Sequence, residues 1–372
     1  MAIIQNHQLL RKLSFISDDS VKYFRLCSTD EKQEIIFEYI PKVYTDYLEN
    51  DYELFIFENN YLDAENDVFQ VYDVEKDIRL GWLFPITILE SNDNNFADNE
   101  HLNRYKYVAF RKLILSDSID YKVGIDINKL SISDIYSNNA IILILSKKQL
   151  KNIDDFKIEN YLPTLASFGY YLRNEHKLTA SFKINKDFAL KRRGNVRLNL
   201  KKSKRDLTKL FFFKHLYLKY LKTIDHHLIR FHILYQVIEH FIGESFEYNF
   251  ETLIENYQKG ILQKNDFFEK IYELKKEREN IRFIFECLNK FSSSELESIK
   301  IDLKRDCITL LETYSPDSKD HLGDLIYDVR NLVVHNYRNI KEEEIVLLEN
   351  ITFELELVIN VLIENYSPQQ CI

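Results

Sequence analysis

The sequence predicts an α+β protein, in which an N-terminal mixed α/β or β-rich domain is followed by a C-terminal all-α helical bundle. Up to about residue 205, short runs of β-branched and aromatic residues lie between clusters of Asn, Asp and Ser, which is typical of strands and turns. After about residue 206, apolar residues recur at steps of three and four, the period of an amphipathic helix. The chain of 372 residues has only 7 Gly and 5 Pro, so long uninterrupted elements are expected.

The N-terminal domain is predicted to span residues 1–205. Apolar and aromatic runs predict strands at Tyr52 to Phe57, Phe69 to Val74, Tyr107 to Leu115, Tyr121 to Ile127, Ala140 to Leu145, Leu178 to Ile184 and Val196 to Leu200. Helices are expected over Thr29 to Leu48 and Ser146 to Leu172. The polar tract that begins at Ser91 predicts a loop over residues 91–103.

The C-terminal domain is predicted to span residues 206–372. Asp225 is placed to cap a helix that runs through His240. The spacing Ser294-Glu295-Leu296-Glu297 is that of a capping box and predicts a helix that ends at Leu311. Further helices are expected over Phe267 to Leu288, Asp320 to Tyr337 and Glu342 to Tyr366. Successive amphipathic helices of this kind predict a bundle.

The sequence does not read as that of a membrane or secreted protein. The longest purely apolar runs, such as Ala140 to Leu145, are far too short to cross a bilayer. The N-terminal residues lack the basic and apolar regions of a signal peptide. The cysteines have no close pairing, so neither a disulfide framework nor a zinc site is expected; they are Cys27, Cys287, Cys307 and Cys371. A cytoplasmic protein in a reducing compartment is the economical expectation.

Several enzyme classes are disfavoured by the absence of their motifs. The sequence contains neither GxGxxG nor GxxxxGK[ST], so a dinucleotide-binding or P-loop enzyme would have to work without its usual loop. It also supports no Ser-His-Asp or Cys-His arrangement. No cofactor is therefore expected.

The net charge of −9 conceals a strong polarity along the chain. Residues 51–100 contain thirteen acids and two bases, whereas residues 183–209 contain eleven bases and two acids. The second stretch includes a basic strip, which consists of Lys191, Arg192, Arg193, Arg197, Lys201, Lys202, Lys204 and Arg205. A strip of this density attracts a phosphate backbone, so it is predicted to bind RNA. In the alternative interpretation, it only balances the acidic stretch.

The motif that carries chemistry runs from Tyr327 to Tyr337 and reads YDVRNLVVHNY. Its Arg330 and His335, near the end of an all-helical domain, resemble the RxxxxH signature of HEPN ribonucleases. The run from Arg230 to Glu239 looks like the early helix of the Apea-like HEPN branch. The resemblance covers roughly residues 206–366. It implies an all-α HEPN-like bundle that pairs with a second copy about a two-fold axis, as a homodimer.

RNA cleavage at the substrate's own 2′-hydroxyl needs a base, an acid and positive charge at the phosphate, and it can proceed without a metal ion. His335 can exchange protons near neutral pH, and Arg330 offers a charged fork that matches phosphate oxygens. Asn331 is expected to orient the phosphate or the His ring. On one helix, residues five apart are turned by about 140°, so one copy of the motif forms no compact site. The resemblance implies that two copies meet in one groove and complete it.

Two supporting residues are also predicted. Tyr337 lies beside the motif, and Glu239 is expected to pair with an Arg of a neighbouring helix near Arg330. The histidines around Glu239 are too widely spaced for one metal and are interpreted as surface or core residues; they are His226, His227, His232 and His240. A purely structural role for Arg330, paired with Asp328 or Glu343, remains open.

Together these features predict a metal-independent endoribonuclease, with tRNA, mRNA or phage RNA as its substrate. Its N-terminal domain would sense a trigger or select the RNA, and a phage-derived trigger or a regulatory partner would control it. A role in anti-phage defence, as an abortive-infection effector or a toxin, rests on the family resemblance alone. Two alternatives stay open. One is a non-catalytic HEPN-like module that binds RNA or a partner, and the other is a nuclease gated by a signalling nucleotide in the N-terminal domain.

Overall fold

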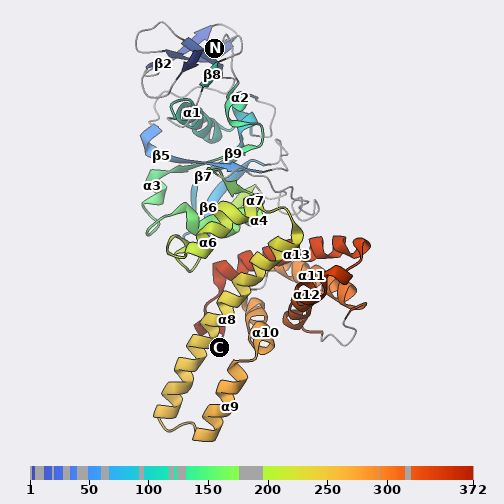
Figure 1. The fold of residues 1–372 in the computed structure, drawn as a ribbon. Coiled ribbons are helices and arrows are strands. Elements are labelled where there is room, and N and C mark those ends of the chain that lie inside the picture. Colours follow the sequence, from blue (N-terminus) through green and yellow to red (C-terminus); the bar gives the residue numbers. More distant parts are fainter. Residues whose placement is uncertain are drawn as a thin grey trace. The chain divides into compact units, whose positions relative to one another are not determined.

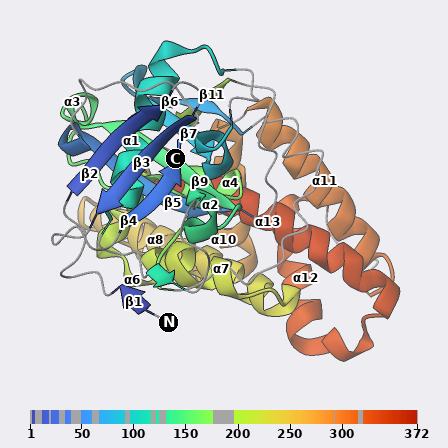
Figure 2. The ribbon, with the colours of Figure 1, turned by 90° about the horizontal axis from the view of Figure 1, so that it is seen from above.

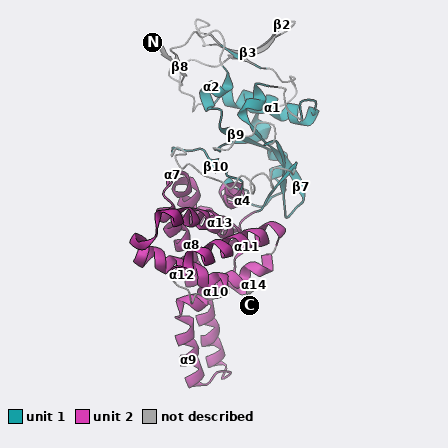
Figure 3. Cartoon of the chain, turned by 90° about the vertical axis from the view of Figure 1, so that its right-hand side faces the viewer, with its two compact units in different colours: residues 1–158, 168–178, 183–201 teal, residues 159–167, 179–182, 202–372 magenta. Residues whose placement is uncertain are grey.

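The computed structural model describes residues 2–4, 12–18, 21–27, 34–39, 49–59, 67–91, 96–116, 121–123, 131–175, 196–291, 293–314 and 320–371. The chain divides into two compact units (Figure 3). Unit 1 comprises residues 1–158, 168–178 and 183–201, and unit 2 comprises residues 159–167, 179–182 and 202–372. The strands belong to unit 1 and most of the helices to unit 2, which confirms the predicted α+β class.

Unit 1 is built on a six-stranded sheet with the strand order β10-β5-β9-β7-β6-β11. Its strands are β5 (Tyr52–Glu58), β6 (Phe69–Asp73), β7 (Ile78–Pro85), β9 (Ala140–Ser146), β10 (Tyr171–Leu172) and β11 (Arg197–Leu200). β11 pairs parallel to β6, and all other neighbours in this sheet are antiparallel. The first six residues of β9 are all buried, because this strand lies inside the sheet with both faces covered.

Two smaller sheets also belong to unit 1. β1 (Ala2–Ile4) pairs antiparallel with β8 (Tyr121–Val123). β2 (Lys12–Asp18), β3 (Val21–Cys27) and β4 (Glu34–Glu38) form an antiparallel three-stranded sheet, whose strands lie side by side in Figure 2.

Helix α1 (Glu100–Ile114) packs on the six-stranded sheet and supplies much of the core of unit 1. The Asn99 side chain accepts a hydrogen bond from the Leu102 amide at 3.0 Å and so caps the helix. Ten of its fifteen residues are buried, and eight of these belong to a core cluster that also contains Trp82 of β7. Two shorter helices, α2 (Ile132–Tyr136) and α3 (Lys147–Leu150), complete the described helices of this unit beside short 3₁₀ turns.

Two predictions for this unit are overturned by α1. The strand expected over Tyr107 to Leu115 is wrong, because residues 107–114 form the second half of the helix and Leu115 is its C-cap. The Asn99 cap and the burial of a helical face outweigh the β-propensity of their aromatic and β-branched side chains. The same helix takes residues 100–103 out of the loop predicted over residues 91–103.

Two predicted helices of the N-terminal part are also wrong. The helix expected over Thr29 to Leu48 contains β4 instead, because Ile35, Ile36 and Phe37 pair with β3. The helix expected over Ser146 to Leu172 is broken into α3, α4 (Leu162–Ser167) and β10. Between α3 and α4, Asp155 has a φ of 48°, which is incompatible with a continuous helix.

The remaining strand predictions have different outcomes. The strands expected at Tyr52 to Phe57, Phe69 to Val74, Ala140 to Leu145 and Val196 to Leu200 correspond to β5, β6, β9 and β11. The strand expected at Tyr121 to Ile127 is described only as far as Val123. The strand expected at Leu178 to Ile184 lies outside the described residues.

Unit 2 is a helical bundle around α13 (Ile345–Asn365), which packs against α4, α8 (His227–Gln258) and α11 (Ser294–Leu311). α12 (Leu322–Asn336) packs against α10 (Glu277–Cys287) and α11. The other α-helices described here are α6 (Phe211–His215), α7 (Leu221–Thr223), α9 (Lys264–Leu274) and α14 (Pro368–Cys371). Figure 1 shows α8 and α9 side by side as a helical hairpin.

The helices expected over Ser294 to Leu311, Asp320 to Tyr337 and Glu342 to Tyr366 correspond to α11, α12 and α13. Three details differ from the predictions. α8 begins after His226 rather than Asp225 and continues to Gln258. The helix expected over Phe267 to Leu288 is interrupted between α9 and α10. Ser293, and not Ser294, caps α11, because its hydroxyl accepts a hydrogen bond from the Leu296 amide.

Among the helices of the described residues, none is long and apolar enough to cross a bilayer. Among the cysteines, Cys307 is free and buried, whereas Cys287 is disulfide-bonded. The bonded Cys287 departs from the expectation that no cysteine would be paired.

Candidate functional site

Helix α12 carries the Arg330-His335 motif, and the two ends of the motif differ in their burial. Its buried face includes Val329, Leu332 and Val333, which pack into the bundle. Arg330 and Asn331 are half-buried, and His335 is exposed near the last turn. The amphipathic spacing of the apolar residues therefore turns the polar residues of the motif away from the core.

Two arginines of α10 hold the first half of α12 in place. Arg282 donates two hydrogen bonds from Nε to the carboxylate of Asp324, each of 2.8 Å, and Asp324 is completely buried. Arg278 forms a close ion pair with Asp328. Asp328 is therefore engaged by Arg278, and Glu343 lies 4.0 Å from the Lys341 ammonium. Neither acid is the partner of Arg330 that the structural interpretation of this residue requires.

The Arg330 guanidinium lies against an aromatic ring instead of a carboxylate. It is 5.5 Å from the centre of the Tyr235 ring on α8, and its Nη1 donates to Asn331 Oδ1 at 3.1 Å. The Tyr235 hydroxyl donates to Glu277 Oε1 at 2.9 Å, which fixes the ring. Among the residues that the structure describes, Arg330 forms no ion pair, so its charge is available to an anion.

Burial raises the pKa of Tyr235, and its hydrogen bond to Glu277 raises it further. The charge of Arg330 opposes this rise, whereas the charge of Glu239 adds to it. The charges of Arg330 and Glu239 therefore both affect the pKa of the Tyr235 hydroxyl. The expected ion pair of Glu239 with an arginine is not present within the described ranges, where this glutamate is exposed.

His335 is the exposed end of the motif. It forms neither a hydrogen bond nor an ion pair with any part of the chain that the structure describes. Its neighbours Val334 and Asn336 are exposed as well, Val334 to 42%. Five helical residues turn His335 by about 140° from Arg330, so the two side chains leave the helix in different directions.

A second group of titratable side chains lies where α12 ends. Tyr337, the first residue of a 3₁₀ turn (Tyr337–Asn339), places its hydroxyl 3.3 Å from Nε2 of His227, the first residue of α8. Nδ1 of His227 lies 3.8 Å from Oε1 of Glu349 on α13. The three side chains thus connect three helical segments in the order Glu349, His227, Tyr337.

The His227 imidazole is half-buried, and this burial lowers its pKa. The neighbouring His226, whose ring stacks on it at 4.8 Å, lowers the pKa further, and Glu349 opposes the change. Sequence reasoning interpreted His227 as an ordinary surface or core residue and did not single out Glu349. Only the position of Tyr337, two residues after His335, hinted at this group.

The other histidines of α8 lie apart from this group. His240 lies 3.1 Å from Glu244, one turn further along the same helix. No group of three or more His, Cys, Asp or Glu side chains that could hold a metal ion is found in the described part of the chain.

The basic strip is divided between the two units. Lys191, Arg192 and Arg193 lie outside the described residues. Arg197 belongs to β11 in unit 1, and the division into units falls between Lys201 and Lys202.

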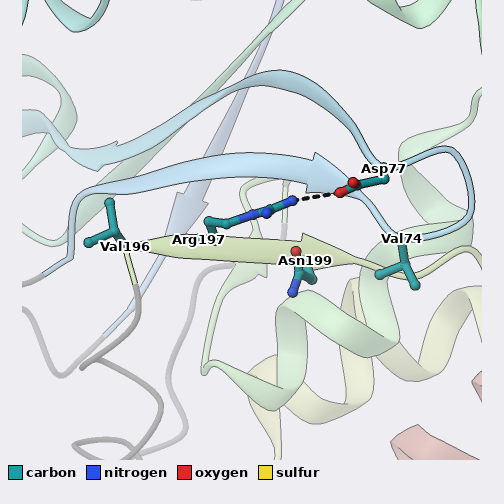
Figure 4. Close-up of a pocket in the computed structure, with 5 residues that line it drawn as sticks. All are labelled: Val74, Asp77, Val196, Arg197 and Asn199. Carbon is teal, nitrogen blue, oxygen red and sulfur yellow. Dashed lines mark hydrogen bonds and ion pairs between the residues drawn. The ribbon is translucent and has the colours of Figure 1, made fainter.

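Arg197 lines an open pocket of about 580 Å³ on unit 1 (Figure 4). Its guanidinium lies 3.6 Å from the centre of the Tyr72 ring and donates to Asp77 Oδ1 at 2.7 Å. The other lining residues are Val74, Val196 and Asn199. The one cation that lines this pocket is thus already paired with an acid.

The unit 2 members of the strip have different surroundings. Lys202 is half-exposed, and the exposed Lys204 places its ammonium 5.6 Å from the centre of the Phe291 ring. Arg205 forms a bidentate pair with Glu244 and lies 4.7 Å from the centre of the Phe241 ring. Its guanidinium also donates to the carbonyl of Tyr366 at 3.2 Å. Arg205 therefore joins α8 to the end of α13.

The chain matches no family model, no curated protein and no solved structure. The candidate site is therefore defined by the geometry of this chain alone. It consists of Arg330 and Asn331 against Tyr235, the exposed His335, and the group of Tyr337, His227 and Glu349 at the end of α12.

Proposed function

We propose that the protein is a metal-independent endoribonuclease of the HEPN type, which cleaves RNA through the substrate's own 2′-hydroxyl. The observation that carries the proposal is the state of the motif. Arg330 has a guanidinium with no carboxylate partner, and His335 is an exposed imidazole with no partner, both with respect to the described residues. A structural arginine would be paired with a carboxylate of the bundle, and a structural histidine would be hydrogen-bonded to it.

These groups supply the chemistry that the reaction needs. An arginine fork binds two phosphate oxygens and stabilises the negative charge that grows on the crowded phosphorus centre. An imidazole transfers a proton to or from a reacting oxygen near neutral pH. Tyr235 keeps Arg330 in place through its ring, and Asn331 orients the guanidinium through its amide oxygen.

The proposal includes a homodimer that acts in the cytoplasm. Because Arg330 and His335 point in directions about 140° apart, a second copy that contributes its own motif would surround one phosphate from both sides. The basic strip from Lys191 to Arg205 would guide the RNA toward the groove. A role as an abortive-infection effector or a toxin against phage follows the family resemblance and has no independent support in the fold.

The test is to incubate the purified full-length chain with total RNA in EDTA and to identify the new ends. We expect cleavage with 2′,3′-cyclic phosphate or 3′-phosphate ends, since the attacking group belongs to the substrate. Arg330→Ala and His335→Ala should each lower the rate by at least about 100-fold. The matched controls are Arg338→Ala and Asn336→Ala, which truncate exposed polar side chains close to His335 in the sequence. Strict Mg²⁺ dependence, or full activity in both motif variants, contradicts the proposal.

A second candidate function is a non-catalytic interaction module, and α9 favours it. None of the eleven residues of this helix is buried. Two of them are large apolar residues, Phe268 and Tyr272, whose side chains are exposed to 58% and 70%. Such apolar surface is typical of a binding face. The EDTA experiment separates the two functions, because an interaction module leaves RNA intact under all conditions.

A further inference from the structure

The group at the end of α12 has the layout of a proton relay. A carboxylate faces one nitrogen of an imidazole, and the other nitrogen faces a hydroxyl. The distances are 3.8 Å from Glu349 Oε1 to His227 Nδ1 and 3.3 Å from His227 Nε2 to the Tyr337 hydroxyl. The same order of acid, imidazole and hydroxyl activates the nucleophile in hydrolases, where the imidazole takes the hydroxyl proton and the carboxylate stabilises the resulting charge.

The protonation state of His227 follows from its surroundings. The groups that face it are Tyr337, Glu349 and the stacked ring of His226. Burial and His226 lower the pKa of His227, so the imidazole is neutral at pH 7 and one of its nitrogens is an acceptor. With its proton on Nδ1, toward Glu349, the ring leaves Nε2 to accept from the Tyr337 hydroxyl. The lone pairs of the Tyr337 oxygen are then free to accept a proton from a substrate.

Tyr337 is also near the motif. It follows His335 by two residues, so their Cα atoms are at most about 7 Å apart. It follows Arg330 by seven residues, or about two helical turns, and both side chains contact α8, Arg330 through Tyr235 and Tyr337 through His227. The relay and the guanidinium therefore lie along the same side of α12.

We propose that Tyr337 is the proton acceptor for the attacking 2′-hydroxyl, with His227 and Glu349 as positioning residues that receive and stabilise the proton. This assignment rests on the proposed function. In the step, the 2′-oxygen forms a bond to phosphorus as the bond from phosphorus to the 5′-oxygen breaks. The 2′-hydroxyl proton passes to Tyr337 while the proton of Tyr337 passes to His227 Nε2. The 5′-oxygen leaves with a proton from the His335 imidazolium of the second copy, whose motif faces the same phosphate from the other side, and a 2′,3′-cyclic phosphate remains.

This assignment gives the two histidines opposite roles. The half-buried His227 is neutral before the step and accepts a proton, whereas the exposed His335 is open to solvent and donates a proton. After the step, His227 returns its proton to water and His335 takes one up. The competing interpretation is a structural clamp, in which the contact of His227 with Tyr337 only ties the start of α8 to the end of α12.

The test is the pH profile of kcat/KM for RNA cleavage by the full-length chain. Tyr337→Phe keeps the ring but removes the hydroxyl, so we expect a loss of at least about 100-fold and the disappearance of the acidic limb. Tyr327→Phe is the matched control on α12 and should leave rate and profile unchanged. Glu349→Gln removes a charge that raises the pKa of His227, so it should move the acidic limb to lower pH. Since the Glu349 side chain is 43% exposed, this second variant leaves the core intact.

The outcomes distinguish a failure of the relay from a failure of the proposed nuclease function. If wild type cleaves RNA and Tyr337→Phe keeps both the rate and the profile, the relay is wrong and the nuclease stands. A clamp would show itself in a Tyr337→Phe variant that is slower at all pH values by one factor, with both limbs in place, together with an unmoved limb in Glu349→Gln. If wild type cuts no RNA at any pH, the proposed function fails, and the role of Tyr337 fails with it.

Discussion

Helices α13 and α9 are both part of unit 2, yet they differ completely in what surrounds them. Fourteen of the twenty-one residues of α13 are buried, whereas none of the eleven residues of α9 is. An isolated helix shorter than about 12–15 residues is marginal in water, so the eleven-residue α9 is stabilised by its contacts with α8 and α10. α13, in contrast, is stabilised by tertiary packing over most of its surface. The difference shows that helix formation and burial in the core contribute separately to the stability of this bundle.

The polar contacts of the two helices differ in the same way. On α13, Glu356 pairs with Arg230 at 2.7 Å, and Glu364 accepts from the Thr164 hydroxyl at 2.7 Å. These pairs are buried and fix α13 against α8 and α4. The contacts of α9 with α8 include one stack of aromatic rings, Tyr257 on Phe267, with the ring centres 4.8 Å apart. Substitutions should therefore have large effects on α13 and small effects on α9.

The largest effect is expected for the buried ion pair of α13. Arg230→Ala removes the guanidinium that pairs with the buried Glu356 carboxylate, and it also removes the hydrogen bonds of Arg230 to the carbonyls of Leu221 and Ile224. We expect a loss of about 3–5 kcal/mol in the free energy of unfolding, measured by urea denaturation. The double variant Arg230→Met with Glu356→Leu should lose much less. An equal loss in the single and double variants would show that the charges are not the cause.

The next largest effect is expected from a cavity in the apolar face of α13. Leu355 is completely buried, so Leu355→Ala should cost about 2–5 kcal/mol in the same measurement, from lost burial and an unfilled cavity. The exposed Val346 at the start of the same helix provides the control, because Val346→Ala should change the stability little. A small effect at Leu355 would mean that α13 is not the centre of the core.

A smaller effect is expected from a buried acid of α13. Burial raises the pKa of Glu354 to about 8, and the nearby Asp306 and Asp302 add to the rise. Because the folded pKa lies above the unfolded value of about 4.5, the folded protein keeps a proton that the unfolded chain loses between these values. Stability should therefore fall as the pH rises through this window, by at most about 1.4 kcal/mol per pH unit.

Glu354→Gln isolates this contribution, since glutamine does not titrate. The free energy of unfolding, measured at pH 6 and at pH 8, should fall less in the variant than in wild type. If both proteins show the same pH dependence, the carboxyl of Glu354 is not protonated in the folded state.

The smallest effect is expected on α9. Phe268 is exposed to 58%, so Phe268→Ala should change the free energy of unfolding by less than about 0.5 kcal/mol. The comparison with Leu355→Ala is direct, because both substitutions remove a large apolar side chain from a helix of the same unit. A loss near that of Leu355→Ala would mean that α9 is covered in solution by something other than this chain.

Local sequence patterns predict the elements that are uniform along their length. The apolar run of β9 and the apolar stripe of α13 were both recognised, because each reads as one period from end to end. β7 was missed, since it includes Gly81 and ends at Pro85, which read as turn residues. In the fold, a Cβ at Gly81 would lie 2.0 Å from the carbonyl oxygen of Ile144, so glycine is required by the close approach of β9.

The residues of the candidate site also fall into two groups, those that a local sequence pattern predicts and those that it does not. Arg330, Asn331 and His335 lie within six residues and form a motif that can be read from the sequence. The contact of His227 with Tyr337 joins residues 110 positions apart, and Glu349 reaches it from a third helical segment. Such a group depends on how α8, α12 and α13 pack, which no local pattern encodes.

The burial of Cys307 gives the bundle an internal reporter of its own motions. This thiol is completely buried on α11, and burial, together with Glu354 and Asp306, raises its pKa well above the usual value. A thiol alkylates only as the thiolate and only when reagent can reach it, so Cys307 reacts only when the interface of α11 with its neighbours α12 and α13 opens. The rate at which this one peptide is labelled therefore measures how often that interface opens, without any denaturant.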